Sequence, residues 1–241
     1  MKEEKIIFTI DQDFLGKINM KLDEQNATLT STDSIIRVRL YSWKPYTISL
    51  GAHQDILQIN EVKAHDLGYD IIRRPTGGRA VLHAEEITYS ITMKILNGTL
   101  HQTYALINNA IKIGLEKYGV KNLEFSRSHP DFKTEYKIDD SASCFNSSAL
   151  NELTWNGKKI VGSAQRRYDD TLLQHGSILI GDEHLNLINC LSCYNDELSI
   201  DKMKLRLKSK TATIKQTLNS DNIKFNEIAN SLKQGFEDVV N

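Results

Sequence analysis

Alternating apolar and polar residues mark the predicted strands of this chain. The clearest alternation starts at Ile87 and continues to Ile95, with Thr, Ser and Lys side chains between the apolar ones. Successive side chains of a strand point to opposite faces, so this period of two predicts a strand with one apolar face and one polar face. The same period over 36–40 predicts a strand that is only half-buried. Shorter apolar runs predict further strands at 6–10, 47–50, 69–72, 80–82, 152–155, 158–164 and 172–180.

Apolar residues three or four positions apart mark the predicted helices. The best example runs from Leu100 to Tyr118, where the apolar residues share one face and Gly119 ends the helix. An earlier helix is expected around Ile18, followed by a polar loop over 23–34. A long loop is expected over 126–143. A short helix is expected after Asn60, and further helices over 183–189, 202–215 and 225–239.

Residues 73–90 carry the most distinctive chemistry of the sequence. They read RRPTGGRAVLHAEEITYS, so one strand enters a Pro-Thr-Gly-Gly turn and a second strand leaves it. Gly77 and Gly78 have no Cβ, can adopt positive φ, and let a ligand approach backbone N–H groups directly. Three arginines add guanidinium groups beside them. The turn therefore suits an anionic or carbonyl ligand, although a basic hairpin with a glycine turn would produce the same pattern.

Composition and charge narrow the class of protein. The chain has 241 residues and a net charge of −1, which gives no general reason to expect nucleic-acid binding. It shows no secretion signal and no apolar stretch long enough to span a bilayer, so we expect a cytoplasmic protein with no membrane partner. Three cysteines are too few for a disulfide scaffold. We expect one domain over 1–241, with a small helical extension from about residue 200.

Cys144 is the candidate nucleophile. The thiolate is the reactive form, so the thiol needs a lowered pKa or a neighbouring base to act efficiently at neutral pH. His83 and His175 each lie at a break in a predicted strand, the second beside a glycine that predicts a bulge or a close ligand approach. Either could supply the base or orient a carbonyl. A small buried hydrophobic role would also account for a cysteine beside Phe145.

Lys159 and a Cys-x-x-Cys pair complete the candidates. Lys159 follows Asn156-Gly157, a strong hairpin signal, and its cation could stabilise charge on a carbonyl oxygen or a phosphate. A solvated surface lysine is the alternative. Cys190 and Cys193 lack a second cysteine pair, so zinc and redox roles have little support and no metal site is expected. On a helix these two cysteines would share one face.

Three segments taken together resemble the lipoate/biotin protein ligase and acyltransferase family. They are RRPTGGRAVLH with EEITYS, then Cys144-Phe145, then NGKKIVGSAQRR with LLQHGSILI, in that order. They look most like its cysteine-dependent octanoyltransferases, which move an octanoyl group from acyl carrier protein to a lysine of a lipoyl domain. The resemblance runs from about the opening helix through Ile180, and weakly into 225–239. It implies an α/β (α+β) fold of the biotin/lipoate protein ligase type, with a mixed, mainly antiparallel sheet flanked by helices and an acyl tunnel near the glycine turn.

Matching positions imply roles for individual residues. Cys144 would accept the acyl group as a thioester, and Lys159 would contact the acyl carbonyl. Ala84 stands where an acidic residue usually follows the histidine, so orientation of His83 by that neighbour is absent. The residues expected to bind substrate are Arg74, Thr76, Gly77, Gly78 and His83, with Gln165, Arg166 and His175 as further candidates.

The resemblance also implies partners and alternatives. Octanoyl-acyl carrier protein would be the donor and a lipoyl-domain protein, such as glycine-cleavage H protein or a 2-oxoacid dehydrogenase E2, would be the acceptor, with no cofactor.

The main alternative is a lipoate-protein ligase that uses ATP and Mg, in which the glycine turn and Lys159 hold an acyl-adenylate and Cys144 only packs. The extra C-terminal domain of many such ligases is not seen, which favours the transferase. Biotin ligase fits less well because its Gly-Arg-Gly-Arg-rich loop is not seen. A third interpretation is a non-catalytic module that binds acylated carrier proteins in the same groove.

Overall fold

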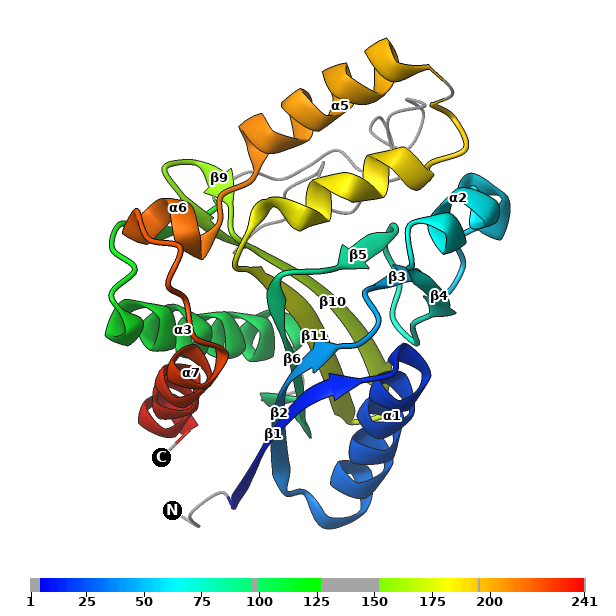
Figure 1. Cartoon of the computed structure of the whole chain (residues 1–241). Helices are drawn as coiled ribbons and strands as arrows, with labels where there is room; N and C mark the ends of the chain where they lie inside the picture. Colours follow the sequence, from blue (N-terminus) through cyan, green and yellow to red (C-terminus); the bar gives the residue numbers. More distant parts are fainter. Residues whose placement is uncertain (1–4, 97–98, 127–151, 195, 241) are drawn as a thin grey trace.

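The computed structural model describes residues 5–96, 99–126, 152–194 and 196–240 (Figure 1). Cys144 and nearly all of the predicted long loop lie outside these residues. Within them, the chain forms one five-stranded sheet and two three-stranded sheets, with helices packed around them.

The five-stranded sheet is mixed but mainly antiparallel. Strand β1 pairs with β2 in parallel, and every other neighbouring pair is antiparallel. Strand β11 pairs with both neighbours without a break at His175 and Gly176, so the predicted bulge is wrong. Gly176 instead permits close approach of β10, because an added Cβ would lie 2.1 Å from the Gly162 carbonyl oxygen. In spatial order the strands are β1 (Ile6–Phe14), β2 (Ile36–Trp43), β6 (Glu86–Lys94), β11 (Thr171–Leu179) and β10 (Val161–Tyr168).

The two faces of this sheet differ in chemistry, and helices cover both (Figure 1). Ile87 and Ile91 of β6 belong to an apolar core shared with α3 and α7. Thr88 and Thr92 point to the other face, which α1 covers, and they are buried as well. Residues 36–40 of β2 are likewise all buried, so the half-burial predicted for them is wrong. The three helices are α1 (Gly16–Asp33), α3 (Leu100–Tyr118) and α7 (Phe225–Val240).

Helix α1 continues to Asp33, through most of the stretch predicted to be a loop. Its inward side is polar, with Asp23 and Thr30 fully buried. The Thr30 hydroxyl pairs with the Thr92 hydroxyl of β6, and Asp23 accepts a hydrogen bond from the Tyr41 hydroxyl of β2. Apolar periodicity does not show the full length of such a helix, because several of the residues that it buries are polar and find their partners on the sheet.

The second sheet carries the glycine turn. Strand β3 (Thr47–Leu50) lies between β4 (Asp70–Arg73) and β5 (Val81–His83). The strands before and after the turn therefore do not pair with each other, and the alternative of a basic hairpin is wrong. Apolar residues of β3 and β5 pack in a second core with η5 and α5.

The third sheet contains the predicted Asn-Gly hairpin. Asn156 and Gly157 have φ values of 48° and 74°, and a type I′ turn requires positive φ at both positions. The strands are β7 (Leu123–Phe125), β8 (Leu153–Trp155) and β9 (Lys158–Lys159). The remaining elements are η1 (Ile56–Gln58), α2 (Glu61–Asp66), η5 (Asp182–Cys190), α5 (Glu197–Lys210) and α6 (Ile214–Leu218).

The Cys-x-x-Cys pair does not lie on one helix face. Cys190 is buried at the end of the 3₁₀-helix η5, whereas Cys193 is exposed in the turn that follows. No group of three or more His, Cys, Asp or Glu side chains placed to hold a metal occurs among the described residues. None of the helices described is both long and apolar enough to cross a membrane.

Candidate active site

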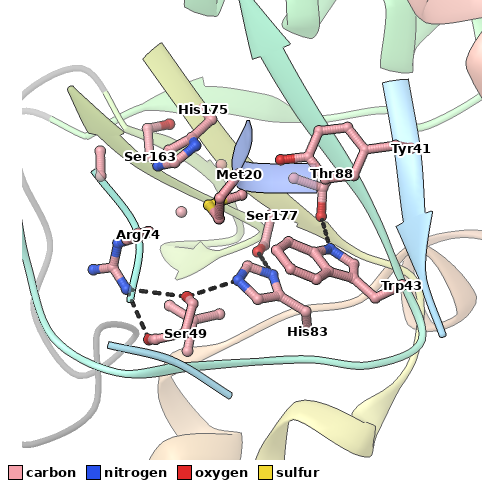
Figure 2. Close-up of a pocket in the computed structure, with 14 residues that line it drawn as sticks. Met20, Tyr41, Trp43, Ser49, Arg74, His83, Thr88, Ser163, His175 and Ser177 are labelled. Atoms are coloured by element: carbon pink, nitrogen blue, oxygen red, sulfur yellow. Dashed lines mark hydrogen bonds between the residues drawn. The ribbon is translucent and has the colours of Figure 1, made fainter. Parts of the chain in front are cut away.

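A small cavity, with about 30 Å³ of internal space, lies where α1, the polar face of the large sheet and the second sheet meet (Figure 2). Met20, Trp43 and Val81 supply apolar walls. The hydroxyl and imidazole groups around it all have partners in the protein; they belong to Tyr41, Ser49, His83, Thr88, Ser163, His175 and Ser177. Since these polar groups already have hydrogen-bond partners in the protein, an apolar ligand would not leave any of them unpaired.

The glycine loop, defined here as residues 74–79, is fixed from within by Arg74. Its guanidinium donates to the carbonyl oxygens of Ser49 at 2.9 Å, Gly77 at 2.8 Å and Arg79 at 2.7 Å. Gly78 has φ +95°, which favours glycine, whereas Gly77 does not adopt positive φ. An added Cβ on Gly77 would meet nothing within 4 Å, so the space over this residue is open to a ligand.

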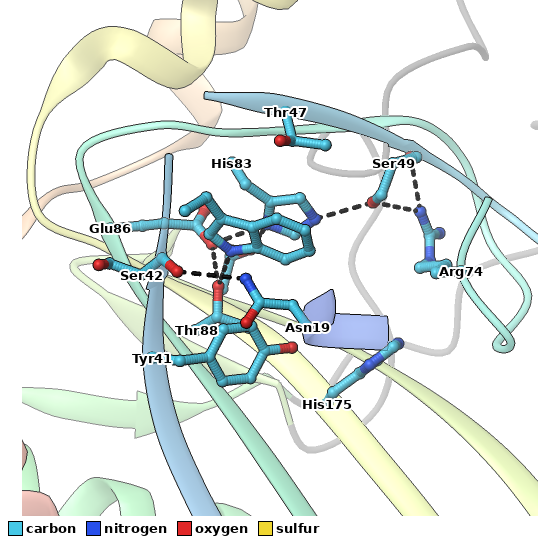
Figure 3. Close-up of polar contacts among 12 residues, drawn as sticks. Asn19, Tyr41, Ser42, Thr47, Ser49, Arg74, His83, Glu86, Thr88 and His175 are labelled. Carbon is cyan, nitrogen blue, oxygen red and sulfur yellow. Dashed lines mark hydrogen bonds and ion pairs between the residues drawn. The ribbon is translucent and has the colours of Figure 1, made fainter. Parts of the chain in front are cut away.

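His83 is held by a carboxylate that was not among the candidate residues predicted from the sequence. Its Nδ1 lies 2.8 Å from Glu86 Oε1 and its Nε2 lies 2.8 Å from Ser49 Oγ. The Trp43 ring stacks on the imidazole, with ring centres 4.0 Å apart. The residue at position 84 indeed provides no carboxylate, and Glu86, three positions after His83, provides it instead (Figure 3).

His175 joins the glycine loop to α1. Its Nε2 lies 2.6 Å from Thr76 Oγ1 and its Nδ1 lies 3.0 Å from Asp23 Oδ2. Thr76 and Asp23 are fully buried, and His175 is 4 % exposed. Burial lowers the pKa of His175, so its imidazole is neutral at pH 7.

The two candidates on β10 lie on different faces of the strand. The Arg166 guanidinium donates to the Pro75 carbonyl oxygen, in the glycine loop, at 3.1 Å. The Gln165 amide donates to Gln174, which in turn bonds Asn108 of α3 on the opposite face of the sheet. The structure therefore brings Arg166 to the loop and does not bring Gln165 to the cavity.

Lys159 is buried on β9, with 5 % of its surface exposed, so the alternative of a solvated surface lysine is wrong. Its Nζ lies 2.7 Å from Glu152 Oε1, in an ion pair whose two side chains are both 5 % exposed. Lys159 does not line the cavity. The segment that follows α5 contacts the backbone of Lys159, because the Ala212 N–H donates a hydrogen bond to the Lys159 carbonyl oxygen.

The structure thus gathers Arg74, His83 and His175 on the cavity wall, with Thr76 bonded to His175. Sequence reasoning missed the carboxylates Asp23 and Glu86, which hold the two histidines. Glu86 stands in the quoted EEITYS segment, so its carboxyl group was a signal that could have been used. Asp23 gave no such signal, because its stretch was interpreted as a polar loop.

Comparison with known proteins finds curated relatives over most of the chain. Two curated relatives are the octanoyltransferases LipM of Bacillus subtilis (strain 168), 33% identical over 229 residues, and of Geobacillus kaustophilus (strain HTA426), 34% identical over 231 residues. Each alignment covers 92% of this chain and 82% of the relative.

Solved structures agree in fold. A bipartite lipoate protein ligase from Thermoplasma acidophilum superposes with a TM-score of 0.74 at 19% identity, covering 98% of this chain and 84% of that one. A lipoate-protein ligase A bound with ATP gives a TM-score of 0.70 at 17% identity, covering 99% and 85%. The α/β fold with a mainly antiparallel sheet flanked by helices is thereby confirmed. The family model described as the lipoyl protein ligase A/B catalytic domain matches residues 16–237. The chain belongs to the lipoyl protein ligase A/B catalytic-domain family.

Proposed function

We propose that the protein is an octanoyltransferase of protein lipoylation, which moves an octanoyl group from acyl carrier protein to a lysine of a lipoyl domain. The observation that carries this proposal is the identity of about one third, over 92% of the chain, to proteins named octanoyltransferase. The cavity supports it, because its paired polar groups and apolar walls suit a saturated acyl chain.

The acyl group would lie in the cavity with its carbonyl at the glycine loop. Gly77 leaves open space there, and Arg74 binds the carbonyl oxygens of Gly77 and Arg79. The loop therefore offers donors rather than acceptors to a carbonyl oxygen. An oxygen that becomes negatively charged during acyl transfer needs donors of this kind.

Transfer would proceed in two steps through Cys144. Its thiolate attacks the thioester carbonyl of the donor, a carbon–sulfur bond forms, and the donor thiol leaves with its proton restored. The acceptor lysine amine then attacks the acyl-enzyme, forms an amide, loses a proton and releases the Cys144 thiol. Lys159 would stabilise the carbonyl oxygen in both steps, and to do so its side chain must turn from Glu152 toward the cavity, whose wall it does not line in this structure. Neither step consumes ATP.

The acceptor would be a lipoyl-domain protein, such as glycine-cleavage H protein or a 2-oxoacid dehydrogenase E2. One of the matched structures is that of a lipoate protein ligase reported with its E2 lipoyl domain, so the fold is compatible with such a partner.

An ATP-dependent lipoate-protein ligase is the second candidate, because a ligase with the same fold is known bound with ATP. That match is only 17% identical and speaks for the fold alone. The relatives with the higher identity carry the transferase name.

Intact-protein mass spectrometry after mixing the protein with octanoyl-acyl carrier protein, without ATP, tests the proposal. We expect a hydroxylamine-labile octanoyl adduct on the wild type and none on Cys144→Ser. Near-normal transfer by Cys144→Ser would exclude the thioester route. Acceptor modification that requires both ATP and free lipoate would make the protein a ligase, and binding without any covalent change would make it a carrier-binding module.

A further inference from the structure

Two buried rows of hydrogen bonds with the same order of groups, carboxylate then histidine then hydroxyl, converge on the glycine loop. One row runs from Asp23 through His175 to Thr76. The other runs from Glu86 through His83 to Ser49, which is bonded to Arg74 (Figures 2 and 3). The rows start on different elements, α1 and β6, and reach the first half of the loop, one at Thr76 and the other at Arg74.

We propose that Asp23 and Glu86 are positioning residues: each holds its histidine in the Nδ1-protonated tautomer, and the two histidines together lock the glycine loop in its acyl-binding conformation. The part of this proposal that concerns acyl binding rests on the proposed function.

The contacts of Asp23 fix the direction of its row. Its Oδ2 accepts from the Tyr41 hydroxyl at 2.9 Å, and Arg39 Nη1 lies 3.5 Å from Oδ1. Burial raises the pKa of Tyr41, so the phenol stays a donor. A carboxylate with these neighbours is an acceptor, so His175 must carry its proton on Nδ1. Nε2 is then the acceptor, and the Thr76 hydroxyl donates to it.

The contacts of Glu86 fix the direction of the hydrogen bonds in the second row, and it is the same as in the first row. Its Oε1 accepts from the hydroxyls of Thr88 and Ser177 as well as facing His83 Nδ1. His83 therefore donates from Nδ1 and accepts at Nε2 from the Ser49 hydroxyl. Ser49 Oγ in turn accepts from Arg74 Nη1 at 3.1 Å. Trp43 stacks on the imidazole and keeps the ring in the plane that both bonds need.

The two rows explain why the loop presents donors to a ligand. Thr76 is anchored by its side chain to His175, and its carbonyl oxygen accepts from the Ala52 N–H at 2.8 Å. Arg74 occupies the carbonyl oxygens of Gly77 and Arg79. If either histidine changed tautomer, a ring lone pair would face a carboxylate and the loop would lose one anchor.

The test compares Asp23→Asn and Glu86→Gln with Glu24→Gln, an exposed neighbour on α1. An amide can donate to Nδ1 and so supports the wrong tautomer in a side chain of the same shape. We expect Asp23→Asn and Glu86→Gln each to slow formation of the octanoyl adduct about tenfold to a hundredfold, mainly in kcat, as replaced orienting partners commonly do. Glu24→Gln should match the wild type.

The direct readout is the nitrogen NMR spectrum of the histidine rings, with amide hydrogen exchange at Gly77 and Gly78. We expect Nδ1-protonated His83 and His175 in the wild type, a changed tautomer of His175 in Asp23→Asn, and faster exchange in the loop. Nε2-protonated rings in the wild type, or unchanged exchange in both variants, would overturn the proposal. These spectra need no substrate, so failure of octanoyl transfer is recognised separately.

Thr76 provides a second test if either amide variant fails to fold. Thr76→Val removes the hydroxyl at constant shape, whereas Thr76→Ser keeps it. We expect Thr76→Ser to recover most of the rate and the loop protection that Thr76→Val loses. Equal rates and equal loop protection in the two variants would contradict the proposal that the Thr76 hydroxyl anchors the loop to His175.

Discussion

At the scale of single residues, the site depends on polar side chains that are buried and paired. Asp23 and Glu86 hold histidines, Glu152 holds Lys159, and Arg74 holds the loop carbonyls. Each group gains stability from its partner and would be costly to leave unpaired. The pairs therefore tie the chemistry of the site to the stability of the fold.

The buried histidines give the protein a pH-dependent stability. Burial lowers the pKa of both His175 and His184, so the folded protein keeps them neutral where the unfolded chain, with pKa about 6.5, protonates them. The unfolded state then binds more protons, and the free energy of unfolding should fall as the pH drops below about 6.5. The Arg37 guanidinium and other partners lower the pKa of Asp33 as well, but such carboxylates act only below about pH 4.

Urea unfolding at pH 7.5 and pH 5.5 measures this effect. We expect a lower free energy of unfolding at pH 5.5 for the wild type and a smaller difference for His184→Gln, which lies outside the cavity. His101→Gln, at an exposed position on α3, should keep the wild-type difference. If the difference in unfolding free energy between the two pH values were the same in His184→Gln as in the wild type, His184 would not contribute to the pH dependence.

At the scale of elements, α3 and α7 pack with their backbones unusually close. An added Cβ on Gly235 of α7 would lie 2.3 Å from the Ala110 carbonyl oxygen, and one on Gly114 of α3 would lie 2.6 Å from Leu232 Cα. Two helical glycines therefore face the partner helix where no side chain fits. Glycine normally weakens a helix, so its presence here reflects packing between the helices.

Gly235→Ala should destabilise the protein, although glycine-to-alanine changes within helices usually stabilise by up to about 1 kcal/mol. The methyl group must push the helices apart, at a cost of about 1–3 kcal/mol. Asn230→Ala, at an exposed position of α7, is the matched control and should leave the melting temperature nearly unchanged or raise it. A higher melting temperature for Gly235→Ala would show that α3 and α7 can move apart at this contact without a cost in stability.

At the scale of the whole molecule, the large sheet separates the main apolar core from the candidate site. One face carries the apolar core with α3 and α7, and the other carries the buried polar network, α1 and the cavity. Phe236 of α7 is fully buried in the apolar core, so the last helix is part of that core. We accordingly propose that no separate unit begins near residue 200.

Phe236→Ala should lower the free energy of unfolding by about 3–5 kcal/mol, as expected for loss of a large buried side chain. Because Phe236 lies across the sheet from the cavity, the rate of octanoyl adduct formation per folded molecule should stay at the wild-type value at low temperature. Urea unfolding and the mass-spectrometric rate, both at 15 °C or below, measure the two quantities. A rate that falls with stability would mean that the two faces are coupled.

Local patterns were sufficient for much of the fold. Alternation identified β6, Asn156-Gly157 identified the hairpin, and Gly119 ended α3 where expected. These features depend on neighbours in the sequence, and the physical rules for turns and caps are local. The family was also recognisable, because its glycine turn and the segment around Lys159 are short continuous motifs.

The sequence by itself determined most of the strands, the Asn-Gly turn, the glycine loop and the family. Only the tertiary structure decided that the polar face of the sheet is buried, that α1 extends to Asp33, and that Lys159 pairs with Glu152. It also decided which carboxylate serves each histidine. The physical reason is distance along the chain: Asp23 and His175 are 152 positions apart, and a buried polar group is satisfied by whatever partner the fold brings to it.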